Sequence, residues 1–325
     1  MKFAIYGFYF DRQFSFNRIS FVPEERNLPF WENVNLINDK NQYVISGYIN
    51  VPDANPDEFI FTMQTVLTFV QQQDVIIKLL SDKEIEKSYP SDSKRRGSAA
   101  PFVMYPDILE EIVEKLYLKL IDDNDLCNQK GNDSVFNLYN NCEFKSLVYK
   151  VTEPFHMRRT FIEITYFLYF SGLEAFCKQY LKSYYPELYS NNAPEAICRV
   201  LEKMEINYVN VFFDSSKYNL KSKQLDTNDF LKLSITTYTR LRNTLFHSNK
   251  FVAEAETSSL KVDNKYPKQE VKIIDFEYTL QRLCNVVILK YIGIENQRLD
   301  CSKWYTRFPL IKSLPKGEVS CPNLK

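Results

Sequence analysis

The chain has little of what sequence-based assignments of function usually rest on: two histidines and seven glycines in 325 residues. Its seven cysteines are scattered and include no Cys-x-x-Cys pair, which argues against a zinc cluster and against a disulfide framework. No apolar run approaches the roughly 20 residues that a membrane span requires. The N-terminal run MKFAIYGFYFDRQF reaches charged residues too early for a signal peptide. We therefore expect a cytoplasmic protein with reduced thiols and no membrane partner.

An excess of one charge sign is also missing, since 41 Lys and Arg balance 41 Asp and Glu. A neutral chain exerts no long-range attraction on polyanions, so a protein that coats nucleic acid constitutively is not expected. A nuclease that concentrates positive charge at one site remains compatible with this balance. Aromatic residues, in contrast, are abundant: 25 Phe and 22 Tyr accompany 45% hydrophobic and 25% charged residues. This composition is typical of a folded, soluble chain with densely packed cores.

The first half is predicted to begin with strands and to continue with mixed elements. Three stretches rich in aromatic and β-branched residues are separated by turn residues and predict strands at 2–10, 14–22 and 42–51. A helix is expected at 58–73 and a short apolar strand at 74–80. Apolar residues at helical spacing place a further helix at 107–122, which the following polar run should end. This half therefore predicts a mixed α/β domain with a β-rich start.

From about residue 150 the pattern becomes helical. Apolar residues at helical spacing predict four helices, the first of them long and largely apolar, at 155–186, 193–204, 230–247 and 275–294. Polar loops are expected between them at 212–229 and 248–272. The sequence therefore predicts an α+β fold in two domains, with an α+β domain at 1–150 and an all-helical domain at 151–325.

One short run in the third predicted helix carries the candidate chemistry. It begins with Arg242 and Asn243 and ends with His247, one of the two histidines. On an ideal helix Asn243 and His247 lie on one face together with Thr239, and the long stem of Arg242 reaches the same patch. Between residues 230 and 250 there are four Lys or Arg residues and no acidic one. The run therefore concentrates positive charge that the whole chain does not show.

These residue types suit the cleavage of RNA without a metal ion or cofactor. A histidine can take the proton of a 2′-OH near neutral pH, and an arginine can hold the phosphate and neutralise its growing charge. An asparagine amide can orient either group. We therefore predict Arg242, His247 and Asn243 as catalytic residues. Arg240, Lys250 and Thr239 are weaker candidates for RNA contacts, and DNA is not an expected substrate because it lacks the 2′-OH.

The run RNTLFH resembles the R-polar-xxx-H signature of the HEPN superfamily of ribonucleases. The preceding run FIEITYFLYFSGLEAFCKQYL looks like the long family helix around a buried Leu-Glu, here Leu173 and Glu174. The spacing between the two runs and the final KYIGI are similar to ApeA-like HEPN defence proteins, over roughly residues 150–295. This resemblance implies a helical bundle that acts as a homodimer, in which two motif helices form one composite site. It also implies a role in antiphage defence, with an N-terminal domain that senses a trigger or an inhibitor.

For Glu174 and His156 the sequence predicts a location in the fold but no catalytic role. Glu174 lies in a very apolar helix, where a charge must be paired or neutral, so we expect it to pair with Arg242 or another base behind the site. Arg242 and His247 are about 140° apart on an ideal helix, which also favours a second copy to complete the site. His156, at the start of the first predicted helix, fits a surface position better than a catalytic role.

Plainer interpretations of the same residues remain open. Arg242 could be a surface residue and His247 a helix-ending residue that suits the helix dipole. Lys94, Arg95 and Arg96 fit a solvated loop better than an RNA contact, and Tyr238 and Phe246 fit a core better than base-stacking positions. The alternative function is a non-catalytic HEPN-like module that dimerises and binds RNA or protein. A different enzyme in the N-terminal half is not favoured, because that half has no glycine-rich phosphate loop, nucleophile elbow or zinc signature.

Overall fold

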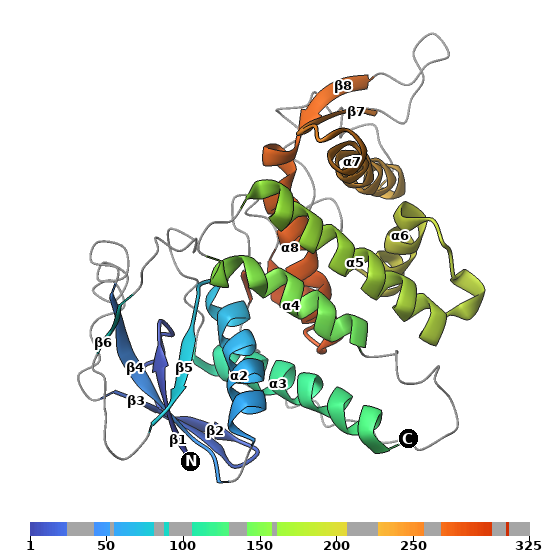
Figure 1. The fold of residues 1–325 in the computed structure, drawn as a ribbon. Coiled ribbons are helices and arrows are strands. Elements are labelled where there is room, and N and C mark those ends of the chain that lie inside the picture. The colour runs from blue at the N-terminus through green and yellow to red at the C-terminus, as the bar shows by residue number, and fades with distance from the viewer. Residues whose placement is uncertain are drawn as a thin grey trace.

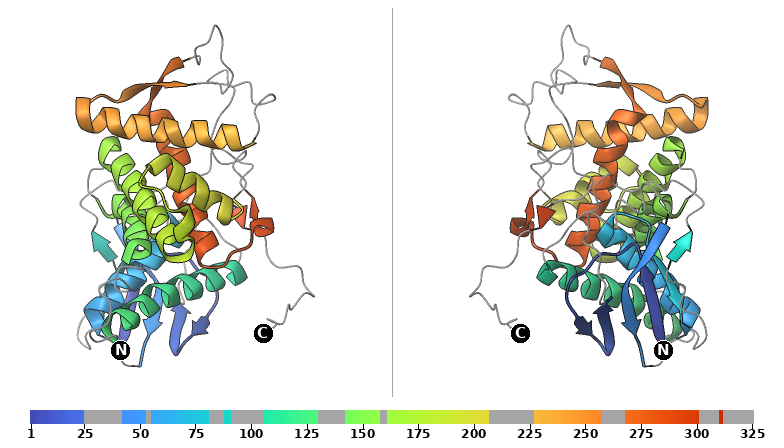
Figure 2. Two further views of the ribbon diagram at one scale, coloured as in Figure 1. Left: turned by 90° about the vertical axis from the view of Figure 1, so that its right-hand side faces the viewer. Right: turned by 90° about the vertical axis from the view of Figure 1, so that its left-hand side faces the viewer.

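The computed structural model describes residues 1–24, 42–52, 55–80, 88–90, 106–129, 142–157, 161–206, 227–256, 268–300 and 310–311. Its fold is α+β, with an antiparallel sheet at the N-terminal end of the molecule and a stack of helices beyond it (Figures 1 and 2). The α+β class and the β-rich start are therefore confirmed. None of the described helices is long and apolar enough to cross a membrane.

The sheet has the order β2-β3-β4-β1-β5, with β6 paired to β4 and every pair antiparallel. Its strands alternate between two faces, so Phe3 and Ile5 enter the main core while Ala4 and Tyr6 join a small cluster on the other side. The strands are β1 (Lys2–Tyr6), β2 (Phe14–Phe16), β3 (Ile19–Pro23), β4 (Gln42–Asn50), β5 (Ile76–Leu79) and β6 (Ser88–Pro90).

The single strand predicted at 14–22 is wrong, because these residues form a hairpin. Asn17 and Arg18, with φ of 42° and 65°, make the turn between β2 and β3. A two-residue turn with positive φ at both residues usually contains glycine. This turn has none, so the sequence gives no signal for it. Phe14 pairs with Phe21 across the hairpin, and their rings stack at 4.3 Å on the main core.

Helices α2 (Pro56–Gln71) and α3 (Pro106–Gln129) pack against one face of the sheet. Phe59 of α2 contacts both Phe3 of β1 and Tyr117 of α3, with ring centroids 4.9 and 6.1 Å apart. The polar side chain of Asn55 caps α2 by accepting from the N–H of Asp57 (3.2 Å). Because α3 continues to Gln129, the predicted end of this helix near residue 122 is wrong.

The long helix predicted at 155–186 is divided at its start. Residues 155 and 156 belong to a separate helix, α4 (Cys142–His156), and α5 runs over Ile162–Tyr184. α4 packs against both α2 and α5, so the domain boundary predicted at residue 150 falls inside a helix that joins the two halves. The close approach of α4 and α5 uses Gly172, where an added Cβ would lie 3.3 Å from the Cα of Leu147.

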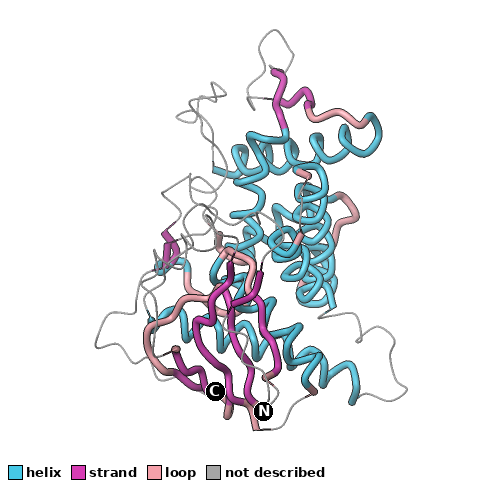
Figure 3. Tube along the Cα trace, turned by 60° about the vertical axis from the view of Figure 1, so that its left-hand side comes forward, coloured by secondary structure: helices cyan, strands magenta, loops and turns pink. Residues whose placement is uncertain are grey.

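Helices α4, α5 and α7 (Thr227–Ser248) pack against α8 (Ile273–Tyr291), whose residues are buried on all sides of the helix for most of its length. α6 (Ala193–Lys203) and α7 both pack against α5. A hairpin at the end of the molecule away from the sheet follows α7 (Figure 3), where a polar loop was predicted, and that prediction is wrong for its strands. The hairpin consists of β7 (Val252–Glu256) and β8 (Lys268–Lys272). The short elements are η2 (Pro186–Leu188) between α5 and α6, and η5 (Asn296–Arg298), β9 (Leu299–Asp300) and β10 (Leu310–Ile311) near the C-terminus.

A buried polar turn joins the sheet-bearing half to the helices beyond it. Gln72 ends α2 at φ 54°, and its Oε1 accepts from Gln281 Nε2 and Asn285 Nδ2 of α8, both at 3.3 Å. Two residues later, Asp74 Oδ1 lies 2.5 Å from Nδ1 of His156 at the end of α4. The side chain of Asp74 is 1% exposed and that of His156 23%, so His156 is half-buried in a pair with Asp74 rather than freely exposed as predicted.

A second interaction ties α3 to the C-terminal segment, and we call Glu111, Lys115 and Arg298 the Glu111 cluster. Both terminal nitrogens of Arg298 donate to the two oxygens of Glu111, at 2.9 and 2.7 Å. Lys115, one helical turn from Glu111, donates to the same carboxylate at 2.7 Å. Burial raises the pKa of Glu111, but the hydrogen bonds from Arg298 and Lys115 outweigh it and leave the pKa below its ordinary value.

Candidate functional site

Helix α7 is held in place by one apolar side. Ile235, Tyr238, Leu241 and Leu245 on this side are all buried, as the helical spacing predicts. The backbone carbonyl of Tyr238 accepts from the hydroxyl of Tyr166 on α5 at 3.0 Å. Its own hydroxyl lies 2.7 Å from Thr279 Oγ1 on α8. Tyr238 is therefore a core residue, and α7 is fixed against both α5 and α8.

The opposite side of α7 carries the last part of the motif to the surface. Asn243 and His247 are exposed, and Phe246 is 54% exposed while one side of its ring packs on Phe167 of α5 at 4.6 Å. The core position predicted for Phe246 is therefore wrong. The helix ends just after His247, because Asn249 adopts φ 49° and its N–H donates to the Leu245 carbonyl at 3.0 Å. Among the described residues, His247 makes no hydrogen bond or ion pair.

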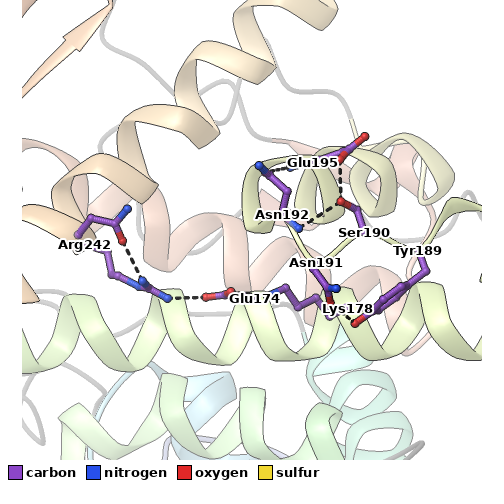
Figure 4. A network of polar contacts seen from close by, with 9 residues as sticks. Glu174, Lys178, Tyr189, Ser190, Asn191, Asn192, Glu195 and Arg242 are labelled. Atoms are coloured by element: carbon purple, nitrogen blue, oxygen red, sulfur yellow. Dashed lines mark hydrogen bonds and ion pairs between the residues drawn. The ribbon is translucent and has the colours of Figure 1, made fainter.

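Arg242 lies at the border between the packed and the exposed sides of α7. Its Nη2 donates to Oε2 of Glu174 on α5 at 2.9 Å, and its Nη1 donates to Oδ1 of Asn243 at 2.8 Å (Figure 4). The guanidinium also lies over the ring of Phe170, 5.3 Å from its centroid. The side chain of Arg242 is 30% exposed and that of Glu174 16%. The predicted pairing of Glu174 with Arg242 is thus found, and it orients a half-exposed guanidinium.

Lys178 is a residue of this site that sequence reasoning missed. Its Nζ donates to Oε1 of Glu174 at 2.7 Å, so one carboxylate holds two cations from two helices. We call Glu174, Lys178, Arg242 and Asn243 the Glu174 cluster. The only sequence signal for Lys178 was its position four residues after Glu174, a spacing that surface Glu–Lys pairs use on many helices.

The three weaker candidates for RNA contacts are placed differently from one another. Arg240 is turned toward the hairpin, where it donates to Glu256 Oε1 at 2.8 Å and to the Glu254 carbonyl at 3.2 Å. Thr239 is half-buried and its hydroxyl donates to the Ile235 carbonyl at 2.9 Å. Lys250 is exposed beyond the end of α7. Lys94, Arg95 and Arg96 lie outside the described residues.

Chemically, the arrangement offers an oriented cation, an exposed amide and an exposed imidazole on one helix. Arg242 can hold an oxyanion at its exposed edge while Glu174 fixes its orientation. His247 lies five residues further along, about 140° around the helix, and is accessible to a ligand or to another chain. In the part of the chain that the structure describes, no three His, Cys, Asp or Glu side chains lie together as metal ligands would.

Compared with protein-family models, with curated proteins and with solved structures, the chain gives no match.

Proposed function

We propose that the chain is a metal-independent endoribonuclease of the HEPN type. The observation that carries this proposal is the ion pair between Arg242 and Glu174, which presents the motif arginine half-exposed next to Asn243. A buried guanidinium could not bind a phosphate, and an unsupported one would lose side-chain entropy on binding it. The helical half would then be a HEPN-like bundle, with the motif on α7 and its support on α5.

In this mechanism RNA supplies its own nucleophile. The 2′-oxygen attacks the adjacent phosphorus while its proton passes to one imidazole of His247. The bond from phosphorus to the 5′-oxygen breaks, and that oxygen takes up the proton from the imidazolium that the first step formed. Arg242 neutralises the charge that grows on the non-bridging oxygens, and Asn243 orients a phosphate oxygen or the imidazole. The products are a 2′,3′-cyclic phosphate and a 5′-hydroxyl.

The site would be completed in a homodimer through α7. Within one chain, Asn243, Phe246 and His247 form an exposed side of the helix, and 54% of Phe246 faces solvent. Two copies of this side placed against each other would bury both phenylalanines and bring the histidine of one copy toward the arginine of the other. The partners are therefore a second copy of this chain and an RNA substrate.

The N-terminal α+β half would control this nuclease in antiphage defence, by binding a trigger or an inhibitor. Its support is the buried turn in which Gln72 contacts α8 and Asp74 contacts the end of α4. A ligand that moves this turn would act directly on helices that pack against α5, which carries Glu174. The role in defence rests on the resemblance of the motif and its preceding helix to HEPN defence proteins.

One observation favours a second candidate function, a non-catalytic module that dimerises and binds RNA or protein. Arg242 uses both terminal nitrogens within the chain, on Glu174 and Asn243, as a structural ion pair would. In such a module the motif would only shape the surface of α7. Loss of His247 would then leave its activity unchanged.

The test is RNA cleavage by the purified protein in EDTA, comparing wild type with Arg242→Ala and His247→Ala and analysing the product ends. Cyclic phosphate ends from wild type, with cleavage reduced at least about 100-fold in both variants, are expected. Ser248→Ala, next to the histidine and also exposed, is the matched control and should cut like wild type. Cleavage at the wild-type rate by both site variants would refute the site. RNA that is bound but never cut would favour the second function.

Mixing the two inactive variants tests the composite site. A heterodimer of Arg242→Ala and His247→Ala chains keeps one arginine and one histidine on different copies, and these face each other if the composite site pairs the arginine of one copy with the histidine of the other. We expect such a mixture to regain part of the wild-type cleavage after subunit exchange, while neither variant alone does. A mixture that stays inactive although heterodimers form would show that the two residues act from the same chain.

A further inference from the structure

Two cations meet at one carboxylate beside the motif. Arg242 and Lys178 bind different oxygens of Glu174, at 2.9 and 2.7 Å, so they are held within a few ångströms of each other. The three side chains together carry one net positive charge. Arg242 has a role in the proposed function, and Glu174 supports it, but the proposed mechanism leaves Lys178 unused.

Lys178 is placed to be more than a partner for Glu174. Its side chain is 28% exposed and that of Arg242 30%, so solvent reaches both cations beside the carboxylate that they share. In Figure 4, Lys178 lies on the far side of Glu174 from Arg242, toward the connection between α5 and α6 that carries Tyr189 and Asn191, with its ammonium group directed at Glu174. A phosphate strand bound at Arg242 could therefore continue along α5 past Lys178.

The Glu111 cluster shows what the same three residue types look like when they are only structural. There the arginine, Arg298, is 7% exposed and uses both terminal nitrogens on the carboxylate of Glu111. Around Glu174, the arginine gives the carboxylate one nitrogen and the exposed Asn243 the other. An anion could take over the second nitrogen there by displacing one neutral amide. Of the two cations in the Glu111 cluster only Lys115, 38% exposed, reaches solvent, because the buried arginine has both terminal nitrogens on the carboxylate.

We propose that Lys178 is a second phosphate-binding residue of the same site, which contacts the phosphate next to the one held by Arg242. This inference rests on the proposed function and specifies its substrate class: a single RNA strand with at least two consecutive phosphates. Lysine suits this role because its ammonium group is a compact charge with rotatable donors that adapts to a phosphate oxygen. Glu174 keeps both cations in place until the strand arrives.

The experiment measures how the affinity for a fluorescent single-stranded RNA falls with salt, in a His247→Ala background so that no cleavage interferes. Removing one cation that binds a phosphate of a single strand lowers the slope of log K against log salt by about 0.7. We expect Lys178→Met to lower the slope by this amount and Lys178→Arg to restore it. Lys115→Met, which removes the equivalent lysine from the Glu111 cluster, should leave the slope unchanged.

An unchanged slope in Lys178→Met, or an equal loss in Lys115→Met, would overturn the inference, as would a failure to bind RNA at all. A melting curve for each variant shows whether it is folded. Cleavage by the wild-type protein decides the proposed function separately. If wild type cuts RNA and the slope does not change, only the role of Lys178 fails. If the slope changes as expected and wild type never cuts, Lys178 binds phosphate and the nuclease activity fails.

Discussion

The molecule contains two glutamates that each pair with a lysine and an arginine in nearly the same way. The difference between the two clusters distinguishes a structural ion pair from a candidate ligand-binding site. Glu111 and Glu174 each accept from the lysine one helical turn later and from an arginine distant in sequence. The arginine of the first, Arg298, is 7% exposed and bidentate, whereas Arg242 is 30% exposed and divided between Glu174 and Asn243. The residue types and their spacing are thus shared, whereas the burial of the arginine and the distribution of its hydrogen bonds differ.

This comparison shows why an ion pair alone does not identify a functional site. When a buried arginine binds a carboxylate with both terminal nitrogens, it is shielded from solvent and can stabilise structure but cannot bind a ligand. A half-exposed pair contributes little to stability and keeps a donor within reach of solvent. The two clusters therefore make opposite predictions for the same substitutions.

The largest expected effect is on cleavage when arginine is replaced by lysine in each cluster. Arg242→Lys keeps the charge but cannot bridge Glu174, Asn243 and a phosphate with a planar group, so cleavage should fall about 100-fold. Arg298→Lys should leave cleavage at the wild-type rate. The measurement is the initial rate on the same RNA, with each variant first shown to be folded. Equal losses of cleavage rate in the two variants would show that the two clusters do not differ in function.

The next largest effect is on the free energy of unfolding, and here the variant of Arg298 should lose more than the variant of Arg242. Arg298→Ala leaves the carboxylate of Glu111 without its bidentate partner, and we expect it to lower the free energy of unfolding by about 2 kcal/mol. Arg242→Ala should lower it by less than about 1 kcal/mol, because the pair is partly solvated and Lys178 still binds Glu174. Urea unfolding of the two variants measures both values. A larger loss in Arg242→Ala than in Arg298→Ala would contradict the comparison.

The smallest effect is a pH dependence that belongs to the Glu111 cluster. Because the pKa of Glu111 is lowered in the folded protein, its stabilisation is complete above the unfolded pKa of about 4.3 and is lost as the pH falls through the folded pKa. Glu111→Gln should therefore unfold less steeply with acid than wild type below about pH 4.3. Glu114→Gln, an exposed carboxylate on the same helix, is the control. If the free energy of unfolding falls equally with decreasing pH in wild type and Glu111→Gln, the ionised carboxylate is not stabilised by folding.

Much of the fold, and one contact of the site, followed from local sequence patterns. Alternating and helical spacings predicted the β-rich start and most helices, because such patterns reflect which side of an element is buried. The pairing of Glu174 was predictable for a related reason, since a carboxylate in an apolar helix needs a cation. The turn at Asn17 and Arg18 was not, because its left-handed residues include no glycine. The β7–β8 hairpin was missed because its strands are short and rich in charged residues.

The contacts between distant segments could not be predicted from spacing. His156 follows a Pro-Phe pair and precedes a methionine and two arginines, which is typical of a surface position, yet it binds Asp74, which lies 82 residues earlier. Lys178 has the spacing of an ordinary surface pair, and only the arrival of Arg242 from another helix makes its position informative. Both depend on tertiary packing, which brings together residues that no local pattern relates.

The polar turn at Gln72 and Asp74 has a consequence for how this protein can evolve and be engineered. An apolar interface tolerates exchange for another surface of similar shape, but buried amides and a buried carboxylate require their own partners. A chimera that replaces residues 1–150 with an unrelated sensor would leave the amides of Gln281 and Asn285 facing a surface that cannot accept from them. The two halves are therefore expected to be inherited together, and a new specificity is more readily obtained by changing the outer strands of the sheet than by exchanging the whole domain.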